Sequence, residues 1–274
     1  MGTPTRRTVV EGTAAFAGLA AVQATGLGSA AEAASTRTGN TGRGHPKANV
    51  LLVHGAWVDG SSWDAVIPIL QRHGHTVIAV QLPLTSLADD VAWTRHVLAE
   101  RLEGPTVLAG HSYGGAVISG AATGVKNVIG LVFASAFAPD QGETLGGLNA
   151  LFPPPPGLAH TQPDSLGFLW FEPAAIPTNF AQDIPVAQAR VLASTQKPIA
   201  ARCFVNPAGA PAWKTLPSWF LVSTQDRMIN PDLERFMAAR IRATTIEVRS
   251  SHASPASHPR EVAKLIQAAA HVRA

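Results

Sequence analysis

The stretch "LAGHSYGGA", residues 108–116, places a serine among glycines where one expected element ends and the next begins. The residues at 105–111 are typical of a buried strand, and those at 114–124 are typical of a small-residue helix. Ser112 therefore lies at a sharp strand-to-helix turn, within the pattern Gly-x-Ser-x-Gly. Such a turn strains the serine backbone, so the neighbouring residues must lack bulk. The hydroxyl would stand at a helix N-terminus, which stabilises negative charge. The stretch thus predicts a nucleophilic serine.

Strands and helices alternate on both sides of this turn. Short apolar runs predict strands over residues 48–55, 75–82, 105–111, 128–138, 218–224 and 244–250. Helical spacing and capping residues predict helices over residues 61–74, 86–104, 114–124, 231–241 and 259–272. This alternation predicts an α/β fold, in which helices cover both faces of a mostly parallel, doubly wound sheet.

Residues 139–216 interrupt the alternation. They hold most of the prolines, including the run "FPPPPG" at 152–157, and one helix is expected over 185–195. We expect this segment to form a helical cap over the carboxyl ends of the strands, where open α/β sheets bind ligands. The core would then consist of residues 48–138 and 217–274.

The first 33 residues have the features of a targeting segment. Two adjacent arginines in "TRRTVV" (5–10) precede an Ala- and Gly-rich stretch (12–30) and an Ala-Glu-Ala cleavage pattern (31–33). This order predicts a twin-arginine export signal over 1–33, the export machinery as a partner, and a secreted or periplasmic protein. The stretch is too weakly apolar for a stable membrane anchor. Residues 34–47 would be a flexible lead-in.

The composition excludes several classes of function. The chain has 274 residues, of which 46% are hydrophobic and 14% charged, and it carries a net charge of +3 without a dense Lys/Arg cluster. We therefore expect a globular enzyme with one sizeable core and no nucleic-acid partner. Its single cysteine, Cys203, excludes an intramolecular disulfide and a CxxC metal site.

A serine nucleophile needs a general base, which in this architecture is a histidine near the end of the chain. His252 lies in the loop "SSHASPASHP", directly after the last expected strand, from which it can reach the serine. His258 precedes a proline at the start of the last helix, and His271 lies within that helix. We therefore expect His252 to be the base.

The base in turn needs an acid that orients it. Asp226 directly follows the strand at 218–224, 26 residues before His252. Asp140, which follows the preceding strand, is the alternative, whereas Asp232 is better explained as a first-turn helix acid. We favour Asp226.

Two backbone N–H groups are expected to stabilise the oxyanion. One is that of Tyr113, directly after the nucleophile, and the other is that of Ala56, in the loop "VHGAW" after the first strand. Gly55 allows a tight turn there, and His54 is expected to serve as a structural hydrogen-bonding residue.

Four motifs in this order resemble the α/β-hydrolase superfamily: "LLVHGAW" (51–57), "GHSYGG" (110–115), "STQDRMI" (223–229) and "SHASPASHP" (251–259). The resemblance covers about 48–272, and it is strongest to small capped bacterial esterases related to plant methylesterases and hydroxynitrile lyases. It implies a catalytic triad and an oxyanion hole made of Ser112, Asp226, His252, Ala56 and Tyr113.

Two positions bear on this resemblance. Relatives often have a glycine just before the catalytic histidine, where this chain has Ser251, which restricts the loop slightly. Hydroxynitrile lyases of the group also use a lysine near the active site. Lys214 is the only lysine in 200–240 and does not look placed for that role, which counts against the lyase.

We therefore expect a secreted serine hydrolase that cleaves a carboxylic ester of a small to medium hydrophobic substrate. The candidate pocket residues are Trp57, Trp170 and Phe171. No metal or organic cofactor is expected, because the triad supplies nucleophile, base and acid. The alternatives are a cofactor-free hydroxynitrile lyase or perhydrolase on the same triad, and a non-catalytic ligand-binding protein.

Overall fold

Six parallel strands form the central sheet of the computed structural model, which describes residues 47–271. The strands are β1 (Asn49–Val53), β2 (Val77–Val80), β3 (Thr106–Ser112), β4 (Val128–Ala136), β8 (Ser218–Ser223) and β9 (Thr244–Val248). Their order is β2-β1-β3-β4-β8-β9, and each neighbouring pair is parallel. The export signal expected over 1–33 lies outside the described residues, as does 34–46 of the lead-in.

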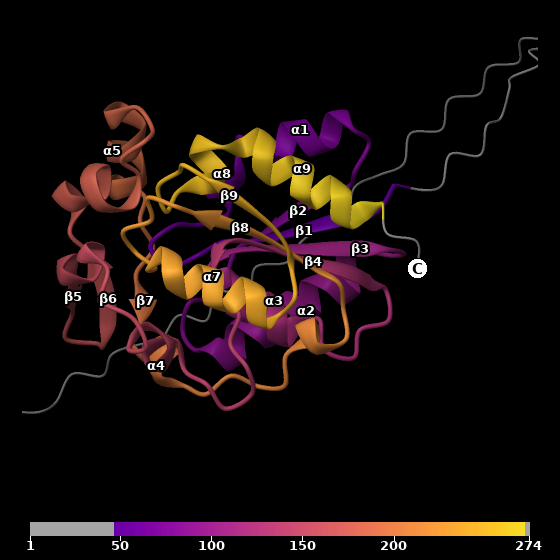
Figure 1. The fold of residues 1–274 in the computed structure, drawn as a ribbon, viewed down its shortest axis with the longest axis horizontal. Helices are drawn as coiled ribbons and strands as arrows, with labels where there is room; N and C mark the ends of the chain where they lie inside the picture. The colour runs from indigo at the N-terminus through magenta and orange to yellow at the C-terminus, as the bar shows by residue number, and fades with distance from the viewer. Residues whose placement is uncertain (1–46, 272–274) are drawn as a thin grey trace, which may run out of the picture. The chain divides into compact units, whose positions relative to one another are not determined.

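Helices cover both faces of this sheet, which confirms the expected α/β fold (Figure 1). On one face lie α1 (Ile67–Arg72) and α9 (Pro259–Ala270), and on the other lie α2 (Leu87–Arg101), α3 (Tyr113–Ala121) and α7 (Pro231–Arg240). All seven residues of β3 are buried, because a central strand between two helical layers has no solvent face. Among the described helices, none combines the length and apolarity needed to cross a membrane.

The helix expected over 61–74 is divided in two. A 3-10 turn, η1 (Gly60–Trp63), comes first, and Asp59 caps it by accepting a hydrogen bond from the Ser61 amide at 2.8 Å. The α-helix α1 begins only at Ile67, with Pro68 in its first turn. Because proline has no N–H to donate to the preceding turn, a single continuous helix does not form.

The cap segment holds short helices and a second, small sheet. The helical pieces are α4 (Leu145–Asn149), η2 (Pro156–His160), η3 (Pro173–Ala175), η4 (Ile176–Phe180), α5 (Val186–Ser194), α6 (Arg202–Val205) and η5 (Ala212–Lys214). The strands β5 (Thr161–Pro163), β6 (Phe168–Phe171) and β7 (Ile199–Ala200) pair antiparallel. The helix expected over 185–195 is present as α5, and the cap expected over 139–216 contains this three-stranded sheet in addition to its helices.

The small sheet has a local cause. The carboxylate of Asp164 accepts hydrogen bonds from the amides of Leu166 and Phe168, at 2.8 and 2.9 Å, and Gly167 has a positive φ of 80°. These features form a tight turn between β5 and β6. The sequence of β6, "FLWF", is rich in aromatic residues, which favour strands.

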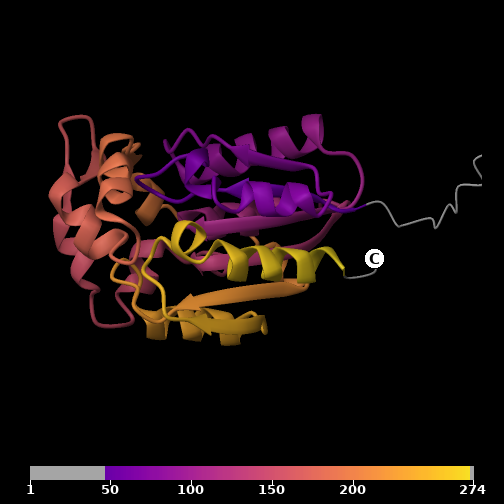
Figure 2. The same cartoon turned by 90° about the horizontal axis from the view of Figure 1, so that it is seen from above.

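The cap segment lies at the carboxyl ends of the parallel strands (Figures 1 and 2). Hydrogen bonds connect it to loops that follow β1, β2 and β9. They join Trp57 to Leu169, Ala200 to Leu84, and Ala253 to Phe180, at 3.0, 2.9 and 3.2 Å. The segment therefore lies next to Ser112, the last residue of β3.

Candidate active site

Ser112 occupies the strained turn that its glycine-rich neighbourhood predicts. Its φ of 54° and ψ of −123° are unusual for a residue with a side chain. A Cβ on Gly110 would lie 2.5 Å from the carbonyl oxygen of Gly114, and a Cβ on Gly114 would collide with the carbonyl oxygen of Val53. Only glycine fits at both positions, so the pattern Gly-x-Ser-x-Gly is a packing requirement of this turn.

Ser112, His252 and Asp226 form one hydrogen-bonded line. The Ser112 Oγ lies 2.8 Å from His252 Nε2, and His252 Nδ1 lies 2.6 Å from Asp226 Oδ2. The other oxygen of Asp226, Oδ1, accepts hydrogen bonds from the amides of Met228 and Ile229, at 2.6 and 2.9 Å. Because Nδ1–H donates to the carboxylate, Nε2 is left to accept the serine proton. This is the geometry that a serine nucleophile needs.

The loop that carries His252 is held on several sides. Asp183 of the cap segment accepts a hydrogen bond from the Ser251 amide at 2.7 Å. The ring of Phe180 meets the imidazole of His252 edge-on, with 4.9 Å between centroids. On the core side, His111 Nε2–H donates to the His252 carbonyl at 2.8 Å. Burial holds the pKa of His111 well below its usual range, so this ring is neutral.

A chain of four buried serine hydroxyls ties the same loop to the sheet. Ser135 Oγ, at the end of β4, lies 2.7 Å from Ser254 Oγ and 2.6 Å from Ser223 Oγ. Ser223 Oγ in turn lies 2.6 Å from Ser250 Oγ. Because Ser250 and Ser254 flank His252, the chain connects the histidine loop to β4 and β8.

Ser251 fits this loop without backbone strain, although relatives often have glycine there. Its φ is not among the positive values that the described non-glycine residues adopt. Its amide is engaged by Asp183, and its hydroxyl accepts a hydrogen bond from the Ala253 amide at 3.1 Å. A glycine is therefore not required at this position.

The alternative acids lie elsewhere. Asp140 forms an ion pair with Lys214 at 2.5 Å, with both side chains partly exposed. Asp232 lies in the first turn of α7 and pairs with Arg235. Of the three candidate acids, Asp226 is the one that contacts His252. Because Lys214 is engaged by Asp140, the lysine that a hydroxynitrile lyase would need is tied to another group.

The alternative bases lie at the two ends of α9. His258 precedes the first residue of that helix, and its Nδ1 lies 2.9 Å from the Ser257 hydroxyl. His271 follows the last residue, with its Nδ1 2.5 Å from the Gln267 carbonyl, and it is exposed. Neither hydrogen bond involves Ser112.

The two expected oxyanion donors flank the serine. A Cβ on Gly55 would lie 2.7 Å from the Cβ of Ser112, so the loop carrying Ala56 passes directly against this serine. Tyr113 is the first residue of α3, and its amide has no acceptor within the helix. The Tyr113 phenol points into the core and donates to Asp90 at 2.6 Å. Burial raises the pKa of Asp90 to about 6.

His54 has the structural role expected of it. The Leu82 amide donates to its Nε2 at 2.9 Å, and its Nδ1–H donates to the Gly55 carbonyl at 2.8 Å. Burial lowers the pKa of His54 to about 4, which keeps the ring neutral at pH 7. The imidazole thus fixes the course of the loop that leads to Ala56.

Aromatic side chains connect this loop to the histidine. Trp57 stacks on Phe204 with 6.0 Å between centroids and contacts Phe171 at 5.5 Å. Phe171 lies 6.2 Å from Phe180, which packs on His252. Two of the three candidate pocket residues therefore belong to this aromatic cluster, which we define as Trp57, Phe171, Phe180 and Phe204.

Trp170 does not belong to the aromatic cluster. It is 42% exposed, and its indole N–H donates to Asp164 at 3.0 Å. Successive residues of a strand face opposite sides, so Trp170 and the buried Phe171 cannot both face the core. The sequence did not predict that Phe180 packs on His252, because the segment around it lacks a hydrophobic period that would show which side chains face inward.

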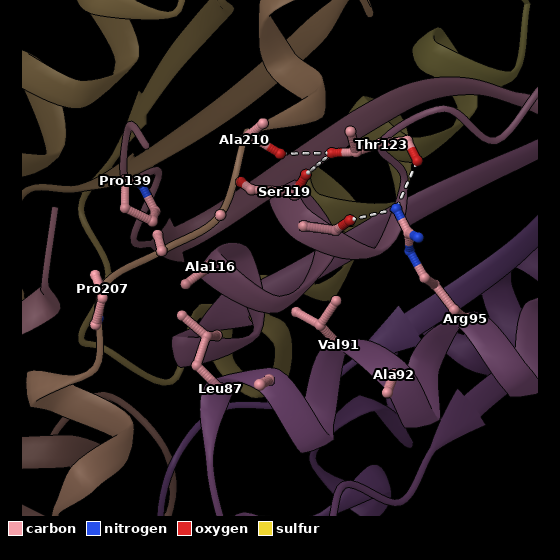
Figure 3. Close-up of a pocket in the computed structure, with 14 residues that line it drawn as sticks. Leu87, Val91, Ala92, Arg95, Ala116, Ser119, Thr123, Pro139, Pro207 and Ala210 are labelled. Carbon is pink, nitrogen blue, oxygen red and sulfur yellow. Dashed lines mark hydrogen bonds between the residues drawn. The ribbon is translucent and has the colours of Figure 1, made fainter. Parts of the chain in front are cut away.

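A separate cavity of about 540 Å³ lies between α2, α3 and residues 207–210 (Figure 3). Arg95 lines it, but its guanidinium donates to the carbonyls of Gly120, Ala121 and Thr123 at the end of α3. The three residues of the hydrogen-bonded line are absent from its lining. This cavity is therefore distinct from the candidate active site.

Comparisons with known proteins agree with this fold. The chain is 34% identical over 111 residues to a carbendazim hydrolyzing esterase of Nocardioides sp. (strain SG-4G), covering 36% of this chain and 46% of the relative. It is 36% identical over 107 residues to a pyrethroid hydrolase of Sphingobium wenxiniae (strain DSM 21828 / CGMCC 1.7748 / JZ-1), covering 35% of this chain and 38% of the relative. The chain thus spans less than half the length of either relative.

A solved structure matches over most of the chain. The crystal structure of a pyrethroid hydrolase from Sphingobium faniae JZ-2 has a TM-score of 0.69, covering 81% of this chain and 97% of that one. At 23% identity, this likeness shows the fold alone. Residues 50–265 match the family described as "Alpha/beta hydrolase family". With its parallel sheet and its serine at the turn after β3, this chain belongs to the alpha/beta hydrolase family.

Proposed function

We propose that this protein is a serine hydrolase that cleaves a carboxylic ester of a small to medium hydrophobic substrate. The observation that carries the proposal is the line from Ser112 Oγ through His252 to Asp226, with distances of 2.8 and 2.6 Å. The names of the two curated relatives, an esterase and a pyrethroid hydrolase, support it.

The reaction would begin with proton transfer from Ser112 Oγ to His252 Nε2 as the oxygen attacks the ester carbonyl. Asp226 would keep the imidazole oriented and stabilise its positive charge. The oxyanion would accept hydrogen bonds from the amides of Ala56 and Tyr113. The histidine would then protonate the leaving alcohol, and the acyl group would remain on the serine. Water activated by the same histidine would release the acid.

The aromatic cluster supports a hydrophobic substrate. Trp57 directly follows Ala56, and Phe180 packs on His252, so apolar rings lie next to the expected oxyanion donor and next to the expected base. Apolar walls favour an apolar group because binding removes its surface from water. Export remains a proposal based on residues 1–33.

The first test is hydrolysis of p-nitrophenyl acetate, butyrate and octanoate by the full chain beside Ser112→Ala. We expect the variant to lose at least ~10³-fold in kcat/KM, because no other group replaces the nucleophile. Ser119→Ala is the matched control. Its hydroxyl is buried in α3 and bonds the Gly115 carbonyl, so activity should change by less than about threefold.

Equal rates for the wild type and Ser112→Ala would contradict the proposal. Cyanide release from a cyanohydrin, or peracid formation from acetate and peroxide, would then support a lyase or a perhydrolase. Stoichiometric capture of a ligand without turnover would support a binding protein.

A further inference from the structure

A second carboxyl group lies behind the triad acid. Glu234, on α7, is fully buried, and its Oε2 accepts a hydrogen bond from the Ser223 amide at 2.9 Å. Its Oε1 is also buried and has no N–H or O–H donor in the described part of the chain. The Asp226 carboxyl lies next to this side chain, because Ser223, whose amide donates to Glu234, accepts a hydrogen bond from the Asp226 amide through its carbonyl at 3.1 Å. A bond between two carboxyl groups requires a proton on one of them.

The surroundings determine which group holds this proton. The Asp226 carboxylate accepts two amide N–H groups as well as His252, whereas Glu234 accepts one amide. More donors favour the ionised form, so Asp226 is the anion and Glu234 the neutral acid. The pKa of Glu234 is raised well above its usual range, mainly by burial and in addition by the negative charge of Asp226.

Other charged groups around the pair do not change this assignment. Arg235 follows Glu234 on α7 and is the nearby cation that opposes the pKa shift. Its guanidinium is already engaged by Glu247 of β9 and Asp232 of α7, both at 2.8 Å. His252 faces the pair only from the far side of Asp226, through Nδ1.

We propose that Glu234 is a positioning residue, which donates its carboxylic proton to Asp226 and thereby holds the triad acid as an anion aimed at His252. This inference rests on the proposed function, because it assigns Asp226 the role of the acid. Glu234 does not touch the reacting atoms and acts through Asp226 alone.

The side chain chemistry suggests a matched pair of variants. In Glu234→Gln, the amide N–H₂ can donate to Asp226 while the amide oxygen still accepts the Ser223 amide. Glu234→Leu has a similar volume but no donor, so Asp226 loses a hydrogen bond and its charge is more localised. A more localised charge favours the protonated imidazole of His252. The acid limb of the kcat/KM profile should then move to higher pH.

We therefore expect Glu234→Leu to shift this limb by about half a pH unit or more and to lower kcat about tenfold, with KM unchanged. Glu234→Gln should keep the wild-type limb and most of kcat. Unshifted profiles in both variants would overturn the positioning role. A shift in both would overturn the assignment of Glu234 as a proton donor.

A second measurement requires neither ester hydrolysis nor the Glu234→Leu variant. The free energy of unfolding of the wild type and Glu234→Gln is compared by urea titration from pH 4.5 to 9. In the unfolded chain Glu234 ionises near its ordinary pKa of 4.5, but in the folded chain it keeps its proton. Above that pH the wild type therefore loses stability relative to Glu234→Gln. The change is tenfold in the folding constant per pH unit, about 1.4 kcal/mol, until the folded group ionises.

A stability difference that is constant with pH would overturn the proposal, because Glu234 would then be ionised in the folded protein. If the wild type shows no ester hydrolysis, the proposed function fails, and the urea titration still decides whether Glu234 holds the proton. If Glu234→Leu does not fold, the urea titration of the wild type and Glu234→Gln decides whether Glu234 holds the proton.

Discussion

At the scale of single residues, backbone strain gathers at the edge of the sheet that carries the candidate site. Among the described non-glycine residues, positive φ values occur at Trp57, Leu84, Ser112, Ser135 and Arg242. Four of these five lie at or just after the carboxyl ends of β1 to β4. Such strain costs about 1–3 kcal/mol per residue and persists only where packing overrides it.

The strain at Ser112 leads to a prediction that separates fold from activity. Ser112→Gly should be more stable than Ser112→Ala by about 1 kcal/mol, because glycine adopts a φ of 54° without the steric cost that alanine retains. Both variants should lack ester hydrolysis to the same extent. Urea unfolding at pH 7 measures the difference, and an alanine variant as stable as the glycine variant would show that the turn is not strained.

At the scale of elements, the close packing of α3 against the sheet determines the positions of Ser112 and Tyr113. A Cβ on Gly115 would collide with the carbonyl oxygen of Phe137 and would lie 2.8 Å from the Cβ of Ala136. Ala136 is the last residue of β4, and Phe137 follows it. The helix α3 can therefore lie this close to the sheet only without a side chain at position 115.

We therefore expect Gly115→Ala to destabilise the protein by about 2 kcal/mol or more and to lower kcat/KM. Alanine is favoured over glycine in a helix by about 1 kcal/mol, but a collision with a main-chain oxygen outweighs this gain. Gly209→Ala is the control, because a Cβ there meets nothing within 4 Å. Urea unfolding and ester hydrolysis measure both variants. Equal stability of the two would contradict the close approach.

At the scale of the whole molecule, buried neutral histidines make stability depend on pH. The pKa of His54 is about 4 in the folded protein, against 6.5 for an ordinary histidine. The unfolded chain therefore binds the proton first as the pH falls. The stability that His54 contributes is fully present above pH 6.5 and is lost as the pH falls toward 4.

The comparison with His54→Gln isolates this effect, because glutamine does not titrate. The stability advantage of the wild type over this variant should shrink by about 3 kcal/mol between pH 7 and pH 4. Urea titrations at pH 7, 5.5 and 4 measure it. Buried acids such as Asp90 titrate in both proteins, so they cancel in the difference. An advantage that stays constant would mean that His54 is not held neutral by burial.

The sequence alone was sufficient where the signal is local. The alternation of apolar runs predicted the parallel sheet, and the glycines around Ser112 predicted the strained turn, because strand length, helix period and glycine tolerance depend on neighbours in the chain. Asp226 and His252 could be selected because each directly follows a strand. All strands of a parallel sheet end at one edge, so residues at these ends lie near one another.

Tertiary packing decided the contacts between residues far apart in the chain. The pairing of β6 with β7 and the packing of Phe180 on His252 have no local signature in a proline-rich segment. Glu234 shares a helix face with Met237 and Ala238, and this spacing indicates burial. However, a glutamate in the charged helix "PDLERFMAARI" is typical of a solvated surface, so the sequence favours neither location. Only the folded chain brings it to Asp226, because burial beside a second carboxyl group depends on where α7 packs on β8.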